Sequence, residues 1–201
     1  NTIATFAVFL TAVLFTALFT IGSGLVDTVQ RQTMRQYGGD YHGILKYLTR
    51  QQYETLSKDP LIRECADAML VADQIKNQAF GKRHLEAWYY PAHYYPYCLF
   101  ELVDGKNPEA ADEILLDEES LRLLGKEPVA GQQVTLAMMV KERTGKVEER
   151  TFTVSGVLRA DPVLNTGFAI VSKTYVDAHA GELVDTFRED FSLTGTIRII
   201  P

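Results

Sequence analysis

Residues 111–125 read ADEILLDEESLRLLG and carry the clearest secondary-structure signals in the charged part of the chain. Residues 113–116 form a short apolar run, which predicts a buried strand. Asp117 follows in an N-cap position, two glutamates occupy the positively polarised first helical turn, and Gly125 stands just after the last leucine. The stretch therefore predicts a strand that leads directly into a short capped helix.

Strand-like segments continue on both sides of this stretch. Residues 133–140 place an apolar side chain at every second position, Thr144-Gly145 is a turn signal, and residues 150–158 return as the partner strand of a hairpin. The expected strands are 41–48, 62–71, 78–90, 113–116, 133–140, 150–158, 168–171 and 196–200. Strands outnumber helices and their spacing favours antiparallel neighbours, so we expect an α+β domain.

Helix and turn signals separate these strands. Thr49 and Gln52 form a capping-box pair that opens a helix, and Asp59-Pro60 stops it. Residues 104–108, DGKNP, predict a turn. A last helix is expected over residues 172–181, with the serine as its cap and the glycine at its end.

The N-terminal part of the chain has a different character. Residues 1–26 carry no charge, so the 20 basic and 26 acidic residues all lie after them. A helix of about 20 apolar residues crosses a bilayer, and residues 1–26 are therefore predicted to be a transmembrane helix. A cleaved signal peptide, suggested by Gly22-Ser23-Gly24, and a buried core helix are the alternatives. The helical period continues, which predicts a helical stalk at residues 27–39 closed by Gly38-Gly39.

Composition and motifs restrict the possible chemistry. A net charge of −6 and an average apolar content argue against a disordered chain and against a nucleic-acid partner. The sequence has no phosphate loop, no G-x-S-x-G, no H-E-x-x-H and no C-x-x-C. Cys65, His93 and Cys98 do not have the spacing of a common zinc site, and apolar residues interrupt the acidic run at 112–119 that a calcium loop would need. We therefore predict no catalytic residue, no cofactor and no metal.

Two further features leave alternatives open. Residues 88–97, WYYPAHYYPY, are unusually aromatic, and Trp88, Tyr90, Tyr94 and Tyr97 are a possible ligand surface, with packing under a loop as the alternative. Cys65 and Cys98 are compatible with a disulfide outside the cell without requiring one. Two separate, partly buried thiols are the preferred interpretation.

The segments 111–125, VAGQQVTL at 129–136, FTVSGV at 152–157 and GFAIVSKTY at 167–175 together resemble the MacB-like periplasmic core domain. That domain occurs in permease subunits of FtsX/MacB-type ABC transporters. Gly105 and Pro108 match the G-x-x-P that precedes its D-E-I strand, whereas Ala130 is inserted in its valine-glycine turn. The middle of the chain looks most like permeases of Gram-positive bacteria. The resemblance implies an extracytoplasmic MacB-like domain at residues 40–201, incomplete at its end, after a first transmembrane helix and stalk.

The resemblance also implies a function and partners. The chain would be a fragment of a permease that couples cytoplasmic ATP hydrolysis to movement of an outer domain, for export or for transmembrane signalling of peptide, lipid or lipoprotein substrates. It implies an ATP-binding subunit as partner, a permease dimer, and a place in the cell membrane with the soluble domain extracytoplasmic. Asn1 is an unusual first residue, so we expect a piece of a longer protein. The alternative function is a single-span anchored sensor or ligand-binding domain, in which the aromatic stretch and the acidic surface hold a cationic peptide.

Overall fold

The computed structural model describes residues 2–36, 39–141, 146–161, 165–181 and 193–199. The chain divides into two compact units, Asn1–Asp40 and Tyr41–Pro201. The first unit contains one long helix, and the second contains a mixed sheet with short helices. The expected fold class, a long apolar helix followed by an α+β domain, is confirmed.

Helix α1 (Thr2–Gln36) runs without interruption past the point where charged residues begin. Five of its threonine hydroxyls donate to the carbonyl four residues earlier, as Thr16 does to Ala12 at 2.8 Å, so these polar groups are satisfied within the helix. By length and composition, residues Thr2–Gln30 can cross a membrane. The Gly39 N–H donates to Met34 O at 2.9 Å, the six-residue bond of a Schellman ending. Gly38, the other half of the predicted cap, lies outside the described residues.

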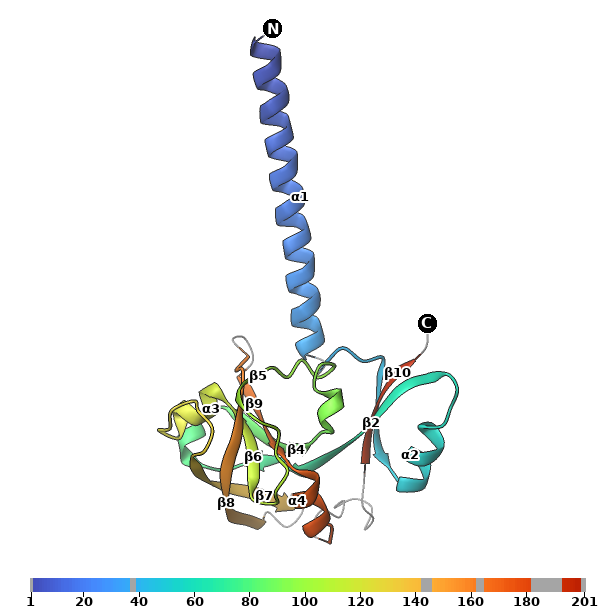
Figure 1. Cartoon of the computed structure of the whole chain (residues 1–201), viewed down its shortest axis with the longest axis vertical. Coiled ribbons are helices and arrows are strands. Elements are labelled where there is room, and N and C mark those ends of the chain that lie inside the picture. Colours follow the sequence, from blue (N-terminus) through green and yellow to red (C-terminus); the bar gives the residue numbers. More distant parts are fainter. Residues whose placement is uncertain (1, 37–38, 142–145, 162–164, 182–192, 200–201) are drawn as a thin grey trace. The chain divides into compact units, whose positions relative to one another are not determined.

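The second unit contains ten strands and three α-helices in its described residues (Figure 1). The strands are β1 (Gly43–Leu48), β2 (Ile62–Ala72), β3 (Gln74–Ile75), β4 (His84–Tyr89), β5 (Leu102–Gly105), β6 (Glu113–Asp117), β7 (Gln133–Lys141), β8 (Lys146–Leu158), β9 (Thr166–Val171) and β10 (Leu193–Ile199). The helices are α2 (Arg50–Leu56), α3 (Glu118–Leu123) and α4 (Lys173–Ala178), with 3-10 turns η1 (Gln78–Phe80) and η2 (Ala92–Tyr94). The strand order is β1-β10-β2-β4-β9-β6-β8-β7-β3, and β5 pairs with β8.

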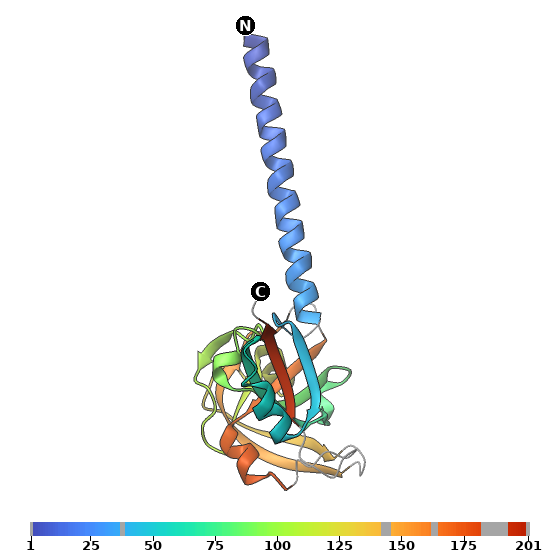
Figure 2. The same ribbon diagram turned by 90° about the vertical axis from the view of Figure 1, so that its right-hand side faces the viewer.

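Strand β2 is shared between two parts of the sheet. Its residues from Ile62 to Ala68 pair with β10, and Met69 to Ala72 pair with β4. Figure 2 shows β1 and β10 side by side with α2 next to them. The strands β1 and β10 and the helix α2 therefore join the rest of the domain through the first half of β2.

The expectation that neighbouring strands are antiparallel is wrong for two pairs. Strand β4 is parallel to β9, and β6 is parallel to β8. Strands adjacent in the sequence, such as β7 and β8, are antiparallel as predicted. The parallel pairs join strands that are far apart in the sequence, where turn signals carry no information about direction.

The main core lies on one side of the strands and under α3 and α4. Leu85, Leu116, Leu136 and Val154 are fully buried there, and Tyr175 of α4 packs against the same cluster. The alternation predicted for residues 133–140 places Leu136 in this core. Thr144-Gly145, predicted as the hairpin turn, lies outside the described residues, as does Ile200.

The predicted start of the helix at Thr49 is confirmed, whereas one predicted strand start and one predicted turn are wrong. The Thr49–Gln52 capping box is present, with reciprocal bonds of 3.2 and 2.9 Å. The strand expected at 78–90 is wrong at its start, because η1 inserts Phe80 into the core and β4 begins only at His84. The turn expected at 104–108 is also wrong, since Gly105 ends β5, where it has a φ of 74° and lies against Gly156.

Candidate functional site

The aromatic stretch at 88–97 leaves β4 and folds back over the sheet. Trp88 belongs to β4, and after Tyr90 the chain turns through η2, in which Tyr94 donates its N–H to Pro91 O at 2.9 Å. Leu99 has a φ of 58°, which is uncommon for a leucine, and the Phe100 N–H next to it donates to Tyr95 O at 3.0 Å. The stretch is therefore an ordered segment closed by its own backbone bonds.

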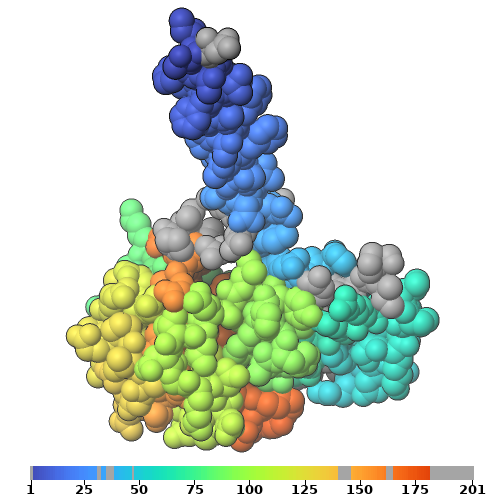
Figure 3. All heavy atoms as spheres, turned by 45° about the horizontal axis from the view of Figure 1, so that its top comes forward, coloured from blue at the N-terminus to red at the C-terminus, as the bar shows by residue number. Residues whose placement is uncertain are grey.

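The structure brings the four predicted aromatic residues together as two ring pairs. The Trp88 and Tyr90 ring centroids are 5.6 Å apart, and those of Tyr94 and Tyr97 are 5.0 Å apart. Tyr90 and Phe100 belong to clusters on both sides and connect the two pairs. In the space-filling view the green atoms of this part of the chain lie at the surface (Figure 3).

Burial divides these residues into different roles. Tyr94 is completely buried against Ala66 and Cys98, so its side chain is part of the packing and offers nothing to a ligand. Burial also raises the pKa of Tyr90 above its usual range and that of Cys98 to about 12. Packing is therefore the role of Tyr94, whereas Trp88, Tyr90 and Tyr97 are only partly buried, and a ligand surface formed by them stays a prediction.

A polar row that the sequence prediction missed begins next to Trp88. His84, Glu86 and Trp88 occupy alternate positions of β4 and point to the side away from the main core. The Trp88 Nε1–H donates to Glu86 Oε2 at 2.7 Å, and His84 Nε2 lies 3.1 Å from Glu86 Oε1. The spacing H-x-E-x-W in a predicted strand was the signal that could have shown this row.

The two cysteines are free thiols and lie on different sides of β2. Cys98 packs against Ala66, and Cys65 is the preceding residue of the strand, so its side chain points to the opposite face. Burial raises the pKa of Cys65 as well. This arrangement confirms the interpretation as two separate thiols.

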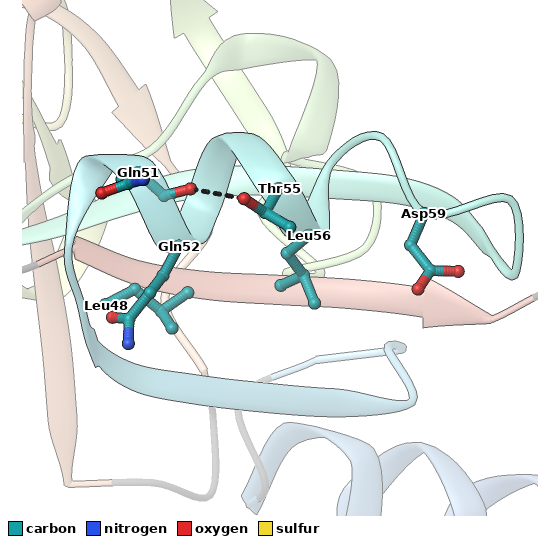
Figure 4. Close-up of a pocket in the computed structure, with 6 residues that line it drawn as sticks. All are labelled: Leu48, Gln51, Gln52, Thr55, Leu56 and Asp59. Carbon is teal, nitrogen blue, oxygen red and sulfur yellow. Dashed lines mark hydrogen bonds between the residues drawn. The ribbon is translucent and has the colours of Figure 1, made fainter.

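A separate cleft of about 420 Å³ lies beside α2 (Figure 4). Its lining residues are Leu48, Gln51, Gln52, Thr55, Leu56 and Asp59. Gln52 accepts the Thr49 N–H, and Asp59 accepts the Leu61 N–H at 2.8 Å, so both polar side chains already serve the local backbone. The cleft therefore offers less free hydrogen-bonding capacity than its composition suggests.

Over the part of the chain that the structure describes, no group of three or more His, Cys, Asp or Glu side chains could hold a metal ion. His93 is exposed, Cys98 is buried, and Cys65 lies on the other side of β2, so the three residues weighed as zinc ligands do not come together. The described residues thus define a membrane-length helix and a mixed α+β domain with a polar row on one strand.

No protein-family model matches the sequence, and no curated protein matches it. Several solved structures are similar to it, among them the following three. One is a domain of a protein described as a permease, from Porphyromonas gingivalis, with a TM-score of 0.46, 14% identity, and coverage of 73% of this chain and 60% of that one. Another is the periplasmic region of MacB from Actinobacillus actinomycetemcomitans, with a TM-score of 0.46, 14% identity, and coverage of 77% and 66%.

The third similar structure is the extracellular domain of the noncanonic ABC-type transporter YknZ from Gram-positive bacteria. It has a TM-score of 0.49 and 12% identity, and the match covers 77% of this chain and 74% of that one. The chain spans 60% and 66% of the first two structures. The first description names a permease and the third an ABC-type transporter, and at 12–14% identity each similarity is remote.

Proposed function

We propose that this chain is the first transmembrane helix, stalk and part of the outer domain of an ABC transporter permease. The observation that carries the proposal is the continuity of α1, which has no break between its uncharged part and the charged residues up to Gln36. At 1.5 Å per residue the helix is about 50 Å long, whereas the hydrocarbon core of a bilayer is about 30 Å thick. A rigid rod would therefore extend beyond the membrane.

The proposed mechanism is mechanical coupling. Nucleotide-driven association of cytoplasmic ATP-binding subunits would move the membrane helices of a permease dimer, and the rod would carry this displacement to the extracytoplasmic domain. The proposed division is a span at residues 1–26, a stalk at 27–39 and the outer domain from residue 40. The chain itself contributes no catalytic residue to this cycle, and export or signalling of a peptide, lipid or lipoprotein remains the proposed outcome.

The test inserts residues between Gln30 and Arg31 in the protein as it occurs in its membrane. A flexible Gly-Ser insertion of seven residues, about two helical turns, should abolish coupling, whereas a helix-forming Ala- and Glu-rich insertion of the same length should keep it. The measurement is the change in amide hydrogen exchange of residues 41–199 between the nucleotide-free and ATP-trapped states. An equal change with both insertions would contradict the rod, and failure to co-purify any ATP-binding subunit would contradict the permease.

A single-span anchored sensor or ligand-binding domain is the second candidate. The observation in its favour is the row His84–Glu86–Trp88, which keeps hydrogen-bonding and aromatic groups on one side of a rigid strand. Absence of an ATP-binding subunit from the purified membrane complex, together with binding of a ligand at this row, would favour it over the permease.

A further inference from the structure

The polar row on β4 holds one carboxylate in a fixed position. Glu86 accepts the indole N–H of Trp88 on one oxygen and faces the His84 ring nitrogen with the other, at 2.7 and 3.1 Å. The Glu86 and His84 side chains remain 32% and 44% exposed. The carboxylate is therefore oriented by its neighbours on a strand and still open to solvent.

This carboxylate retains capacity for a further partner. Each carboxylate oxygen has two lone pairs, and each oxygen of Glu86 uses one of them within the row. A partner that donates to both oxygens would find them already oriented, so little side-chain entropy would be lost on binding. The row thus offers two parallel acceptors at one point of the surface.

Apolar groups flank the same point. Leu70 of β2 lies directly across from Trp88 and is 38% exposed. Phe168 of β9 is the neighbour of Glu86 on the other side and is half-buried. Trp88 itself is half-buried, with Tyr90 against its ring. A ligand at Glu86 would therefore touch an indole and an aliphatic side chain as well as the carboxylate.

These groups together select for a planar cation. A guanidinium donates two parallel hydrogen bonds to one carboxylate and can stack on an indole, whereas an ammonium is a point charge without that geometry. The net charge of −6 also favours the approach of a basic partner. We propose that the row His84–Glu86–Trp88 binds an arginine side chain of a partner polypeptide. The proposal stands with either of the two functions above.

The chain has a single tryptophan, so its fluorescence reports directly on this row. The full chain, in detergent micelles, is titrated with the peptide acetyl-Ala-Leu-Arg-Leu-Ala-amide and with the same peptide carrying citrulline, a neutral analogue of arginine. Arginine should give a saturable change in Trp88 emission with a Kd at least about tenfold lower than citrulline, because a charge-assisted pair is lost in the analogue. A lysine peptide should fall between them.

Variants locate the effect. Glu86→Gln should weaken binding of the arginine peptide at least about tenfold, since it removes the charge and one acceptor. The matched control is Glu54→Gln on the exposed face of α2, which changes the net charge equally and should leave the Kd unchanged. Equal responses to arginine and citrulline, or no saturable response, would overturn the proposal and leave the row as a support of β4. If Glu86→Gln does not fold, the two peptides on the native chain still decide.

Discussion

The Asp117 carboxylate forms a buried ion pair with Arg83 and also caps the start of α3, so replacing Asp117 tests both interactions. Its Oδ1 accepts the Ser120 N–H at 2.9 Å and lies 3.0 Å from the Arg83 guanidinium, and its Oδ2 accepts the Ser120 hydroxyl at 2.6 Å. Only 6% of either charged side chain is exposed. The same carboxylate therefore caps α3 and balances the charge of Arg83.

The helix cap and the buried ion pair contribute different amounts to the free energy of unfolding. Loss of an N-cap costs about 1 kcal/mol, and a buried charge left without its partner costs about 3–5 kcal/mol. We therefore expect Asp117→Ala to lower the free energy of unfolding by about 4–6 kcal/mol, a large part of the stability of a domain of this size. Asp117→Asn keeps a good cap and should lose mainly the charge contribution, about 3 kcal/mol or more.

Urea unfolding of the full chain in detergent, followed by Trp88 fluorescence, measures these differences. The double variant Arg83→Met with Asp117→Asn removes both charges, so it should be more stable than Asp117→Asn alone. A loss of only about 1 kcal/mol in Asp117→Ala, the size of a cap alone, would refute the argument. So would a double variant in which the two single losses simply add.

Three other predictions concern single positions. Gly167→Ala should destabilise the domain by about 1–3 kcal/mol in urea unfolding, because a Cβ there would lie 2.4 Å from an Asp117 oxygen. In the control variant Gly181→Ala the added Cβ meets no atom within 4 Å, so the free energy of unfolding should change little, and equal effects of the two variants would contradict the prediction. Thr49→Ala should speed amide exchange in α2 with a global loss of no more than about 1 kcal/mol, because no α2 residue is buried; slower exchange would be unexpected. Burial raises the pKa of Cys98 to about 12, so at pH 8 iodoacetamide should label it only after unfolding, and rapid native labelling would contradict its burial.

Short-range features of this chain could be predicted from the sequence because their causes are local. The capping box at Thr49 and Gln52 and the cap at Asp117 each depend on residues three positions apart, and both are present. The start of β4 could not be predicted in this way. Phe80 leaves the strand because it fits the core, and Asn77 bonds to the backbone of β7, 58 and 60 residues away in the sequence.

In the candidate site too, local features could be predicted from the sequence and features that depend on distant residues could not. Composition identified the aromatic stretch but could not assign a face to each ring, and Tyr94 is buried while Trp88 stays partly open. The Glu86 row depends on alternation along one strand, which the sequence contains. The spacing H-x-E-x-W lies within the strand expected at 78–90, but alternation alone does not show that these three side chains bond to one another.

In the proposed permease, the order of the strands in the sheet determines the path by which a displacement of the stalk would reach the rest of the domain. The chain passes from Tyr41 into β1, and among the described strands β1 pairs only with β10. Strand β10 pairs with the first half of β2, whose second half pairs with β4. A pull along the stalk would therefore reach β4, and the row on it, through consecutive hydrogen-bonded ladders. Because Ile44 and Leu45 of β1 are exposed and α2 beside this path buries no residue, β1 should yield before the core strands do.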